Sequence, residues 1–362
     1  MSVPADTRRV GPVSAVVVNW QGEGYLPACL EALAGHGLDE VIVVDNASTD
    51  GSLALLAERY PDVRVVRMGE NAGPARARNA GMRAARNRWV LALDNDAIVT
   101  PGLLERLVAV AEEHPDAVVL QPRSVFHDDP GRVHYDGGGL HYAGLIALRN
   151  FYVPLAAAEG EGVLPVDTAV SVCLLVDRDA LLAVGGYDER FFILFEDLDL
   201  SFRLRATGGR ILSVEDAIVR HDAGTAGLSF RRGTDYPASR VFYHSRNRWL
   251  YLAKCYRVRT LLLASPALLL YELVWLAFAV LQGGLLAWVR GKWAVVDGWR
   301  ETRRRRRAFQ ALRERGDEEL LVGGPLTLTP GLKASRLGGL AAGLLDRSLA
   351  AWWALLRPLL AS

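Results

Sequence analysis

The sequence predicts an α/β protein with a Rossmann-like sheet that is mixed but mostly parallel and flanked by helices, followed by a helical C-terminal region. Two observations predict this class. Short runs rich in β-branched residues alternate with helical patterns over the first 125 residues, an order that implies βαβ units. The runs are almost continuously apolar, as expected of strands buried on both faces. The 362 residues, 51% of them hydrophobic, suffice for one large domain and an appendage.

The elements follow in order along the chain. Strands are expected at 13–19, 40–45, 63–67, 89–94 and 117–121, with helices at 26–34, 52–60, 75–85 and 102–114. Residues 126–168 show no regular pattern, and beyond them we expect a strand at 169–176 and helices at 178–184 and 198–206. The chain is therefore expected to divide into a domain of residues 1–235, with halves 13–125 and 126–235, and a helical region of residues 236–362.

An apolar segment, Leu261–Val289, carries Glu272 as its one charge. Its 29 residues exceed the roughly 20 that cross a bilayer core of about 30 Å. Basic residues flank both ends of the segment. Because basic flanks favour the cytoplasmic side of a membrane, both ends are expected on that side, and a single membrane span cannot place them there. Because Pro266 and the run 282–284 (Gln-Gly-Gly) favour breaks in a helix, we expect a re-entrant hairpin or helices lying in the membrane interface. A buried hairpin packed on the domain is the alternative.

The charge is unevenly distributed. From residue 290 onward the chain has 14 Lys and Arg against 7 Asp and Glu, whereas the rest has 28 against 34. A basic, amphipathic tail indicates an anionic partner, and the preceding apolar segment favours a membrane surface over nucleic acid. The three cysteines are scattered and the N-terminus shows no secretory signal pattern. We therefore expect a monotopic or peripheral protein at the cytoplasmic face of the cell membrane.

Three of the expected strands end in polar side chains, namely Asn19, Asp45 and Asp94. Ligands of such sheets bind outside the carboxyl ends of the strands, so these side chains are expected to share one crevice. Asp94-Asn95-Asp96 sets two carboxylates one residue apart, which suits Mg²⁺ or Mn²⁺. The pattern alone is weak, because Asp is also common in turns.

Two further motifs suggest a nucleotide pocket. In the run 45–52, DNASTDGS, a turn with a helix cap explains the last four residues but not Asp45, which could hold a base or a ribose. In the run 71–81, NAGPARARNAG, Asn71 is a candidate cap, Gly73 permits close backbone approach and Arg78 is a donor. A surface helix with exposed arginines is the alternative for this second motif.

Glu196 and Asp197 lie at the start of the helical pattern expected at 198–206 and directly precede it. Acidic residues in a first turn complement the helix dipole, but a carboxylate at the mouth of a cleft also serves as a general base for an incoming hydroxyl. His221 follows the apolar run 217–219 and could complete a metal shell, although a lone histidine is more often structural.

Taken in order, these motifs resemble the family 2 glycosyltransferases with a GT-A fold, and more narrowly the bacterial rhamnosyltransferase-type enzymes of cell-surface polysaccharide assembly. The similarity covers about residues 13–227. The matching stretches are VVVNWQG, VIVVDNASTDGS, NAGPARARNAG, LALDNDAIVTP, GGYDERFFILFEDLDLSFRLRATG and VRHDAGTAG.

The resemblance implies a role for each matching position. Asp197 would be the catalytic base with Glu196 as runner-up, and Asp96 and His221 would bind the metal that bridges the donor diphosphate. The nucleotide-sugar pocket would be formed by Asn19, Asp45, Asn71, Gly73, Arg78, Asp94, Asn95 and Gly186. Asp45 would contact the nucleobase, Arg78 the base or phosphates, and Asp94 the ribose and donor sugar.

The activity implied is inverting transfer of a sugar from a nucleotide-diphosphate sugar to a hydroxyl of a polyprenyl-linked or polysaccharide acceptor. A divalent cation, Mg²⁺ or Mn²⁺, would act as Lewis acid. dTDP-rhamnose is the preferred donor and a UDP-sugar the runner-up. A sugar-phosphate nucleotidyltransferase is an alternative, but the loop NWQGEG after the first strand lacks a basic residue. A non-catalytic membrane-associated scaffold is a second alternative. A dehydrogenase is disfavoured because no G-x-G-x-x-G follows that strand.

Overall fold

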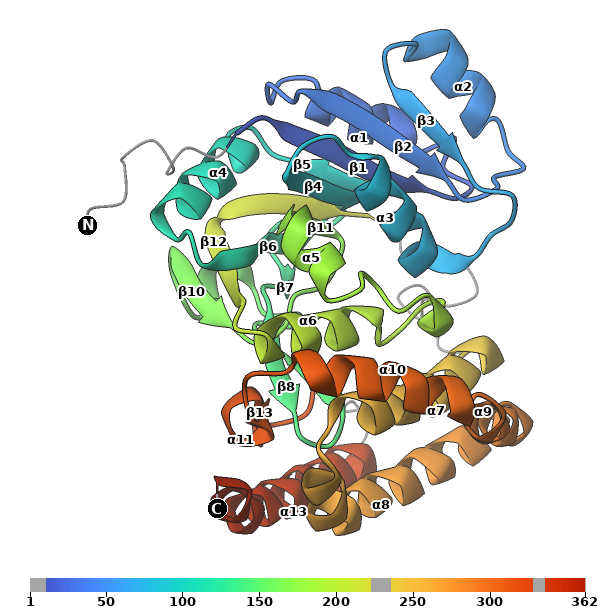
Figure 1. The fold of residues 1–362 in the computed structure, drawn as a ribbon, viewed down its shortest axis with the longest axis vertical. Helices are drawn as coiled ribbons and strands as arrows, with labels where there is room; N and C mark the ends of the chain where they lie inside the picture. Colours follow the sequence, from blue (N-terminus) through green and yellow to red (C-terminus); the bar gives the residue numbers. More distant parts are fainter. Residues whose placement is uncertain (1–10, 223–235, 328–335, 362) are drawn as a thin grey trace. The chain divides into compact units, whose positions relative to one another are not determined.

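The computed structural model describes residues 11–222, 236–327 and 336–361 (Figure 1). Its contacts divide the chain into two compact units. Of the described residues, the first unit comprises 11–137, 150–200 and 209–222, and the second comprises 138–149, 201–208, 236–327 and 336–361. Two segments from before residue 235 thus group with the second unit.

The first unit is built on a mixed sheet with strand order β10-β12-β6-β11-β4-β1-β2-β3. The strands are β1 (Val13–Asn19), β2 (Glu40–Asp45), β3 (Arg64–Arg67), β4 (Trp89–Asp94), β6 (Ala117–Phe126), β10 (Val163–Val166), β11 (Cys173–Asp177) and β12 (Arg210–His221). β1 pairs in parallel with both β2 and β4, and β2 pairs in parallel with β3. β11 lies antiparallel between β4 and β6, which makes the sheet mixed. The predicted α/β class is confirmed.

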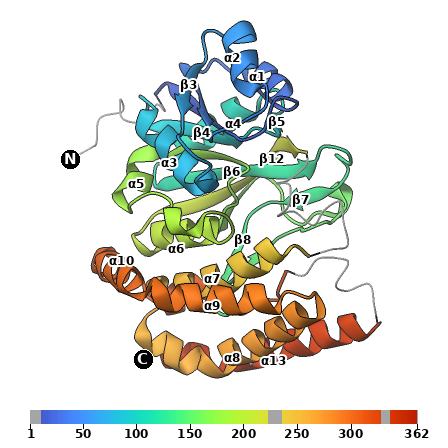
Figure 2. The ribbon, with the colours of Figure 1, turned by 90° about the vertical axis from the view of Figure 1, so that its right-hand side faces the viewer.

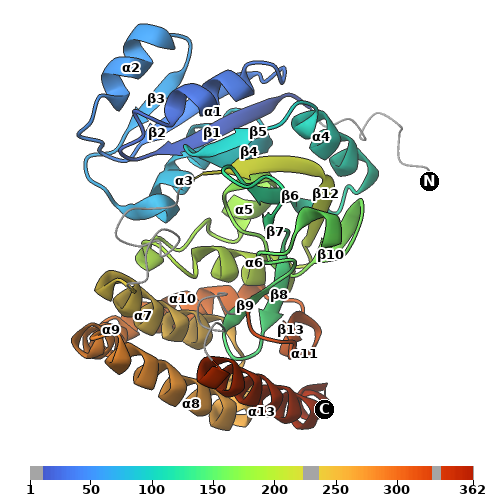
Figure 3. The same ribbon diagram turned by 180° about the vertical axis from the view of Figure 1, so that it is seen from behind.

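Helices cover both faces of this sheet. They are α1 (Leu26–Leu33), α2 (Ser52–Arg59), α3 (Gly73–Ala84), α4 (Leu103–Glu113), α5 (Arg178–Ala183) and α6 (Glu196–Ala206). Helix α3 lies on the face turned to the viewer in Figure 1, and α1 lies on the face seen in Figure 3. Every residue of β1 is buried, as expected of a central strand between two layers of helices. The core of this unit is therefore formed by the apolar strands that the sequence predicts.

Residues 126–168 consist largely of loops and turns, but they also contain short strands that the sequence did not indicate. These are β7 (Val133–Tyr135), β8 (Gly138–His141), β9 (Leu145–Leu148) and β10. Strands of three or four residues are too short for an alternating pattern to stand out from the surrounding sequence. β12 was seen in the sequence only as an apolar run, because its register shifts between Val214 and Ile218, where Glu215 and Asp216 interrupt the pattern. Helix α6 begins two residues before the expected start.

The second unit is mainly helical. It contains α7 (Ala238–Cys255), α8 (Val258–Leu281), α9 (Leu285–Asp297), α10 (Trp299–Leu312), α11 (Asp317–Leu320) and α13 (Arg336–Ala361). β8, β9 and β13 (Leu321–Val322) form a small three-stranded sheet in this unit. Helix α9 packs beside α7, and α13 packs beside α8 (Figure 2). This unit has its own core, including a cluster of Val241, Trp275 and Ala279.

The apolar segment forms two helices that break at 282–284, where Gly283 has a φ of +69°. Pro266 does not break α8, contrary to the expectation. Proline removes the amide that would bond the carbonyl of Leu262, four residues earlier, and the Ser265 hydroxyl donates to that same carbonyl at 2.7 Å. The freed acceptor is thereby satisfied and the helix continues.

Helix α8 is buried on one face only. Glu272, its one acidic residue, accepts hydrogen bonds from Arg248 and Trp249 of α7 and from Trp288 of α9, and it pairs with Lys292 of α9 at 2.6 Å. Among the described residues, α8 alone is long and apolar enough to cross a membrane, a criterion of length and composition that by itself is weak evidence. The neutralised Glu272 anchors α8 to α7 and α9, while leucines elsewhere on the helix remain exposed.

Gly81 tests the packing of α3 on β1. A Cβ at this position would lie 2.2 Å from Cγ1 of the buried Val16. For Gly81→Ala we expect overpacking of about 1–3 kcal/mol to exceed the helix-propensity gain of about 1 kcal/mol, so the thermal unfolding midpoint should fall by a few degrees. Gly343→Ala in α13, where a Cβ would meet nothing within 4 Å, is the control and should leave the midpoint unchanged or slightly higher. Equal midpoints for both variants would contradict the packing.

Candidate active site

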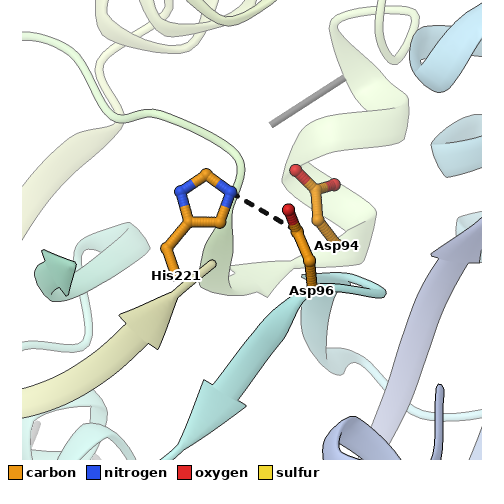
Figure 4. Close-up of side chains that lie close together, drawn as sticks. All are labelled: Asp94, Asp96 and His221. Carbon is orange, nitrogen blue, oxygen red and sulfur yellow. Dashed lines mark ion pairs between the residues drawn. The ribbon is translucent and has the colours of Figure 1, made fainter. Parts of the chain in front are cut away.

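Two strand ends bring Asp94, Asp96 and His221 together (Figure 4). Asp94 ends β4, Asp96 directly precedes β5 (Ala97–Val99), and His221 ends β12. β12 pairs antiparallel with β5 so that His221 lies opposite Ala97, the neighbour of Asp96. His221 Nε2 lies 3.3 Å from Asp96 Oδ1, and the candidate ligand atoms of the three residues lie within 4.8 Å of one another.

This donor set fits a divalent cation. Two carboxylates and one imidazole supply the hard oxygen and borderline nitrogen ligands that Mg²⁺, and more readily Mn²⁺, accept. The Asp94 side chain is 28% exposed and that of Asp96 is 11% exposed, so the group is open to solvent on the side of Asp94. Burial, together with the nearby charge of Asp96, raises the pKa of Asp94 even though Arg78 lowers it. A cation would relieve this crowding of negative charge.

The second ring nitrogen of His221 has a partner that the sequence did not indicate. His221 Nδ1 lies 3.3 Å from Nδ1 of His134, a buried residue of β7. If Nε2 of His221 offers its lone pair towards the aspartates, its Nδ1 carries the proton and donates it to His134. A hydrogen bond to the ring nitrogen that does not face the metal fixes the ring orientation and tautomer of a ligating histidine. His134 lies in the segment that the sequence left without structure, so no pattern could have identified it.

Arg78 joins these carboxylates to the acidic pair of α6. This α3 residue is 5% exposed, so the alternative of a solvent-exposed arginine does not apply to it. Its Nη2 donates to Asp94 Oδ1 at 2.7 Å and to the carbonyl of Ser171 at 3.0 Å, and its Nη1 lies 3.6 Å from Glu196 Oε1. Burial alone would lower the pKa of Arg78, but the surrounding carboxylates outweigh burial and raise it. The guanidinium therefore stays charged.

Asp197 and Glu196 occupy different environments in the first turn of α6. Asp197 is half-buried, and Ser171 holds it twice: its hydroxyl donates to Oδ1 and its amide to Oδ2 at 3.2 Å. Glu196 is 5% exposed, and burial together with the charge of Asp197 raises its pKa to about 8 although Arg78 lowers it. Glu196 thus retains its proton at neutral pH, whereas Asp197 is the more accessible carboxylate.

A strained loop leads into this turn. Phe192, Leu194 and Phe195 all have positive φ values, between 61° and 74°, in a region that residues other than glycine rarely adopt. The carbonyl of Phe192 would lie 2.6 Å from a Cβ at Gly73, which itself has a φ of +82°. The close backbone approach expected at Gly73 is therefore made by the chain's own loop before α6.

Asn19, Asp45 and Asn95 form a connected group at the ends of β1, β2 and β4. Asp45 is 1% exposed, and its oxygens accept from Asn19 Nδ2 at 2.9 Å and from the amide of Ser48 at 3.1 Å. Asn95 Nδ2 donates to Asn19 Oδ1 at 2.8 Å. Asp45 thus holds the turn after β2, and its expected contact with a nucleobase stays a prediction.

The remaining predicted residues, Asn71 and Gly186, fix loops around this group. Asn71 Oδ1 accepts from the amide of Gly73 at 3.1 Å and from Asn46 Nδ2 at 2.9 Å. Gly186 has a φ of +67°, and a Cβ there would lie 2.5 Å from Asn79 Oδ1. Asn79 in turn bonds both the amide and the carbonyl of Tyr187. The glycine therefore permits α3 to hold the turn that precedes α6.

Comparisons with known proteins agree with this architecture. The model of glycosyl transferase family 2 matches residues 14–181. The N-acetylglucosaminyl-diphospho-decaprenol L-rhamnosyltransferase of Mycobacterium tuberculosis is 30% identical over 236 residues, which cover 59% of this chain and 74% of that protein. The amylovoran biosynthesis glycosyltransferase AmsE of Erwinia amylovora is 24% identical over 221 residues, 60% of this chain and 77% of that protein.

Solved structures show the same fold. The crystal structure of GalNAc-T7 with UDP, GalNAc and Mn²⁺ has a TM-score of 0.54 at 16% identity and matches 71% of this chain and 50% of that one. The crystal structure of TarS 1-349 of S. aureus in complex with UDP-GlcNAc has a TM-score of 0.52 at 16% identity and matches 94% of this chain and 89% of that one. The mixed sheet with flanking helices is that of GT-A transferases. The chain belongs to glycosyl transferase family 2 and is a glycosyltransferase.

Proposed function

We propose that this glycosyltransferase transfers rhamnose or a similar sugar from a nucleotide-diphosphate donor to a hydroxyl of a lipid-linked or cell-surface glycan, with inversion at the anomeric carbon. One observation carries the proposal. Arg78 and Ser171 connect the Asp94–Asp96–His221 group to Asp197 in a single network of hydrogen bonds and ion pairs. The side chains proposed to act on the leaving diphosphate are thus connected to Asp197, which is proposed to act on the attacking hydroxyl.

In this proposal Asp96 and His221, together with Asp94, would hold a divalent cation, Mg²⁺ or Mn²⁺. The chemistry supplied there is Lewis-acid stabilisation of the departing nucleoside diphosphate. Arg78 orients the Asp94 carboxylate through its 2.7 Å hydrogen bond. His134 fixes the His221 ring from its opposite edge. The protein thereby supplies a preorganised acidic site for the cation.

Asp197 is proposed as the general base. Its carboxylate accepts the proton of the acceptor hydroxyl, the hydroxyl oxygen bonds to the anomeric carbon, and the bond from that carbon to the diphosphate oxygen breaks. A single displacement of this kind inverts the anomeric configuration. Ser171 orients the carboxylate through two donors, which limits the search for a productive geometry. Glu196 stays the runner-up, since a carboxyl with a pKa of about 8 is mostly protonated at neutral pH.

The proposed donor and acceptor rest on the similarity to the Mycobacterium tuberculosis rhamnosyltransferase. The Mycobacterium tuberculosis protein is named as an L-rhamnosyltransferase that acts on N-acetylglucosaminyl-diphospho-decaprenol. This supports dTDP-rhamnose as donor, with a UDP-sugar as alternative, and a polyprenyl-diphosphate-linked glycan as acceptor. A role in cell-wall polysaccharide assembly follows from such an acceptor. Family membership argues against a nucleotidyltransferase and against a non-catalytic scaffold.

A lipid-linked acceptor requires contact with a membrane, and the second unit has a surface that suits one. Exposed apolar side chains gather on α8, α9 and α13; they include Leu262, Leu269, Leu273, Leu286, Trp293, Leu344 and Leu355. We propose that these helices lie on the cytoplasmic face of the membrane as a monotopic or peripheral attachment. The neutralised Glu272 and the one-sided burial of α8 support an in-plane helix over a lone span.

The metal assignment predicts the behaviour of two variants. Asp96→Asn and His221→Ala each remove one ligand, so the affinity for Mn²⁺ in the presence of a nucleoside diphosphate should fall by calorimetry, and by more than the roughly 10- to 100-fold loss typical of changes to the residues that support the ligands. His114→Ala, which removes an imidazole at the end of α4, is the control and should bind Mn²⁺ as the unaltered protein does. Unchanged affinity in both site variants would remove Asp96 and His221 from the metal site.

The base assignment predicts that Asp197→Asn binds the donor normally but loses transfer about 10²- to 10⁴-fold, because the amide preserves shape but cannot accept a proton. Single-turnover rates and donor binding should be measured together. Glu196→Gln is the matched variant, and its loss of transfer should be smaller. The reverse order of the two losses would make Glu196 the base.

The membrane assignment predicts that the triple change Leu262→Gln, Leu269→Gln and Leu273→Gln moves the protein from the membrane pellet to the supernatant. Each leucine is more than half exposed, so the substitutions remove apolar surface without opening a cavity. The thermal unfolding midpoint provides the control for folding and should not change. Unaltered protein that is already soluble without detergent would contradict the attachment.

A further inference from the structure

The second unit contains a cavity of about 430 Å³ that the transfer reaction does not use. It lies between the start of α8 and one side of α10. Its lining consists of Arg257, Val258, Arg303, Arg306, Arg307 and Gln310. Four of these six side chains carry a guanidinium, and no carboxylate is among them. The volume is within the range of sites for small molecules and headgroups.

Three of the four guanidinium groups have no ion-pair partner within the described part of the chain. Arg257, Arg303 and Arg307 are exposed, and none forms a salt bridge. Glu301, the one acidic residue of α10, pairs with Arg304 and Arg305 instead. The consecutive arginines 303–307 thus separate into two that pair with the single carboxylate of Glu301 and three that line the cavity.

Arg306 and Gln310 connect α10, which forms one side of the cavity, to the end of α7 through hydrogen bonds. Arg306 Nη1 donates to the carbonyls of Ala253 and Tyr256 at the end of α7, and the Gln310 amide donates to those of Lys254 and Cys255. Asp317 lies near the start of α8 and accepts from the Arg257 amide, but Arg313 pairs with it. The nearby acidic charge is therefore compensated, and the cavity stays cationic.

Guanidinium groups gathered in this way fit a phosphate. Arg303 and Arg307 are four positions apart on one helix, a spacing at which like charges destabilise the helix by about 0.2–0.5 kcal/mol. An anion between them would remove this repulsion. The planar fork of arginine matches the oxygen geometry of phosphate, and a monoester or diphosphate offers several oxygens to several forks.

An exposed apolar stripe leads away from the cavity along α8. Val258 lines the cavity, and Leu262, Leu269, Leu273 and Val280 follow it, all between 50% and 69% exposed. At 100° per residue the five side chains fall within an arc of roughly 60°. A cationic cavity at one end of an exposed apolar stripe matches the polarity of a lipid, with its phosphate at one end and its hydrocarbon beyond.

We propose that this cavity binds the terminal phosphate or diphosphate of a membrane lipid whose chain lies along the stripe on α8. The proposal rests on the membrane attachment proposed above and adds to it a preference for one kind of headgroup. Generic attraction to an anionic surface depends only on the number of basic residues, whereas a built cavity distinguishes a terminal phosphate from a phosphodiester of equal surface potential.

The test is flotation of the full-length protein with three kinds of vesicle. These consist of phosphatidylcholine alone, phosphatidylcholine with phosphatidylglycerol, and phosphatidylcholine with phosphatidic acid, the last two matched in zeta potential. We expect binding to phosphatidic acid to exceed binding to phosphatidylglycerol about tenfold. The double variant Arg303→Gln, Arg307→Gln should abolish this difference. Arg300→Gln, Arg304→Gln removes two charges from the same helix outside the cavity and should retain it.

Two results would overturn the proposal. One result is equal binding to the two anionic vesicles, and the other is an equal loss of preference in both double variants. Either result would mean that surface charge alone explains the binding. If the protein binds none of the vesicles, the proposed membrane attachment is contradicted, but the proposed phosphate site is not. The phosphate site is then tested by measuring binding of a soluble short-chain phosphatidic acid. Saturable binding that only the Arg303, Arg307 variant loses supports the proposal. Absence of binding, or equally tight binding of inorganic phosphate, contradicts it.

Discussion

The arrangement of the site depends on one buried cation. Arg78 compensates the charge of the Asp94 carboxylate, whose desolvation without a partner would be costly, and it holds acidic residues from two parts of the chain close together. It pairs with Asp94 from β4 and Glu196 from α6, and it also bonds the carbonyl of Ser171, whose own hydroxyl and amide hold Asp197. Removal of this guanidinium would leave the Asp94 carboxylate without its partner and would break the connection between β4 and the first turn of α6.

The sheet supplies the other constraint. Because β1, β2 and β4 are parallel, Asn19, Asp45 and Asp94 emerge at the same edge, as expected for ligand-binding α/β sheets. The antiparallel pairing of β5 with β12 then returns the chain so that His221 reaches Asp96 from a position 125 residues later in the sequence. The candidate metal group is therefore built by strand pairing rather than by a local motif.

The second unit handles charge in a different way. In α8 the single acidic residue is fully compensated by α7 and α9, so apolar surface can face outward without an isolated charge beside it. In α10 the basic residues exceed the acidic ones, and the excess is gathered around one cavity. These two features give the unit an apolar surface and a cationic pocket, the pair of properties that recognition of a lipid phosphate requires.

The sequence by itself determined the parallel part of the sheet, the helices between its strands, and the two carboxylates that follow β4, because apolar periodicity and strand-end polarity are local properties. It also separated an apolar helix from a basic tail. The tertiary structure alone decided the contacts that depend on distant pairing: His134 behind His221, Ser171 on Asp197, the burial of Arg78, and the arginine cavity. It likewise kept α8 intact at Pro266, through a serine one position earlier. Such contacts join residues 16 to 118 positions apart or rely on a single hydroxyl, and neither leaves a periodic signal in the sequence.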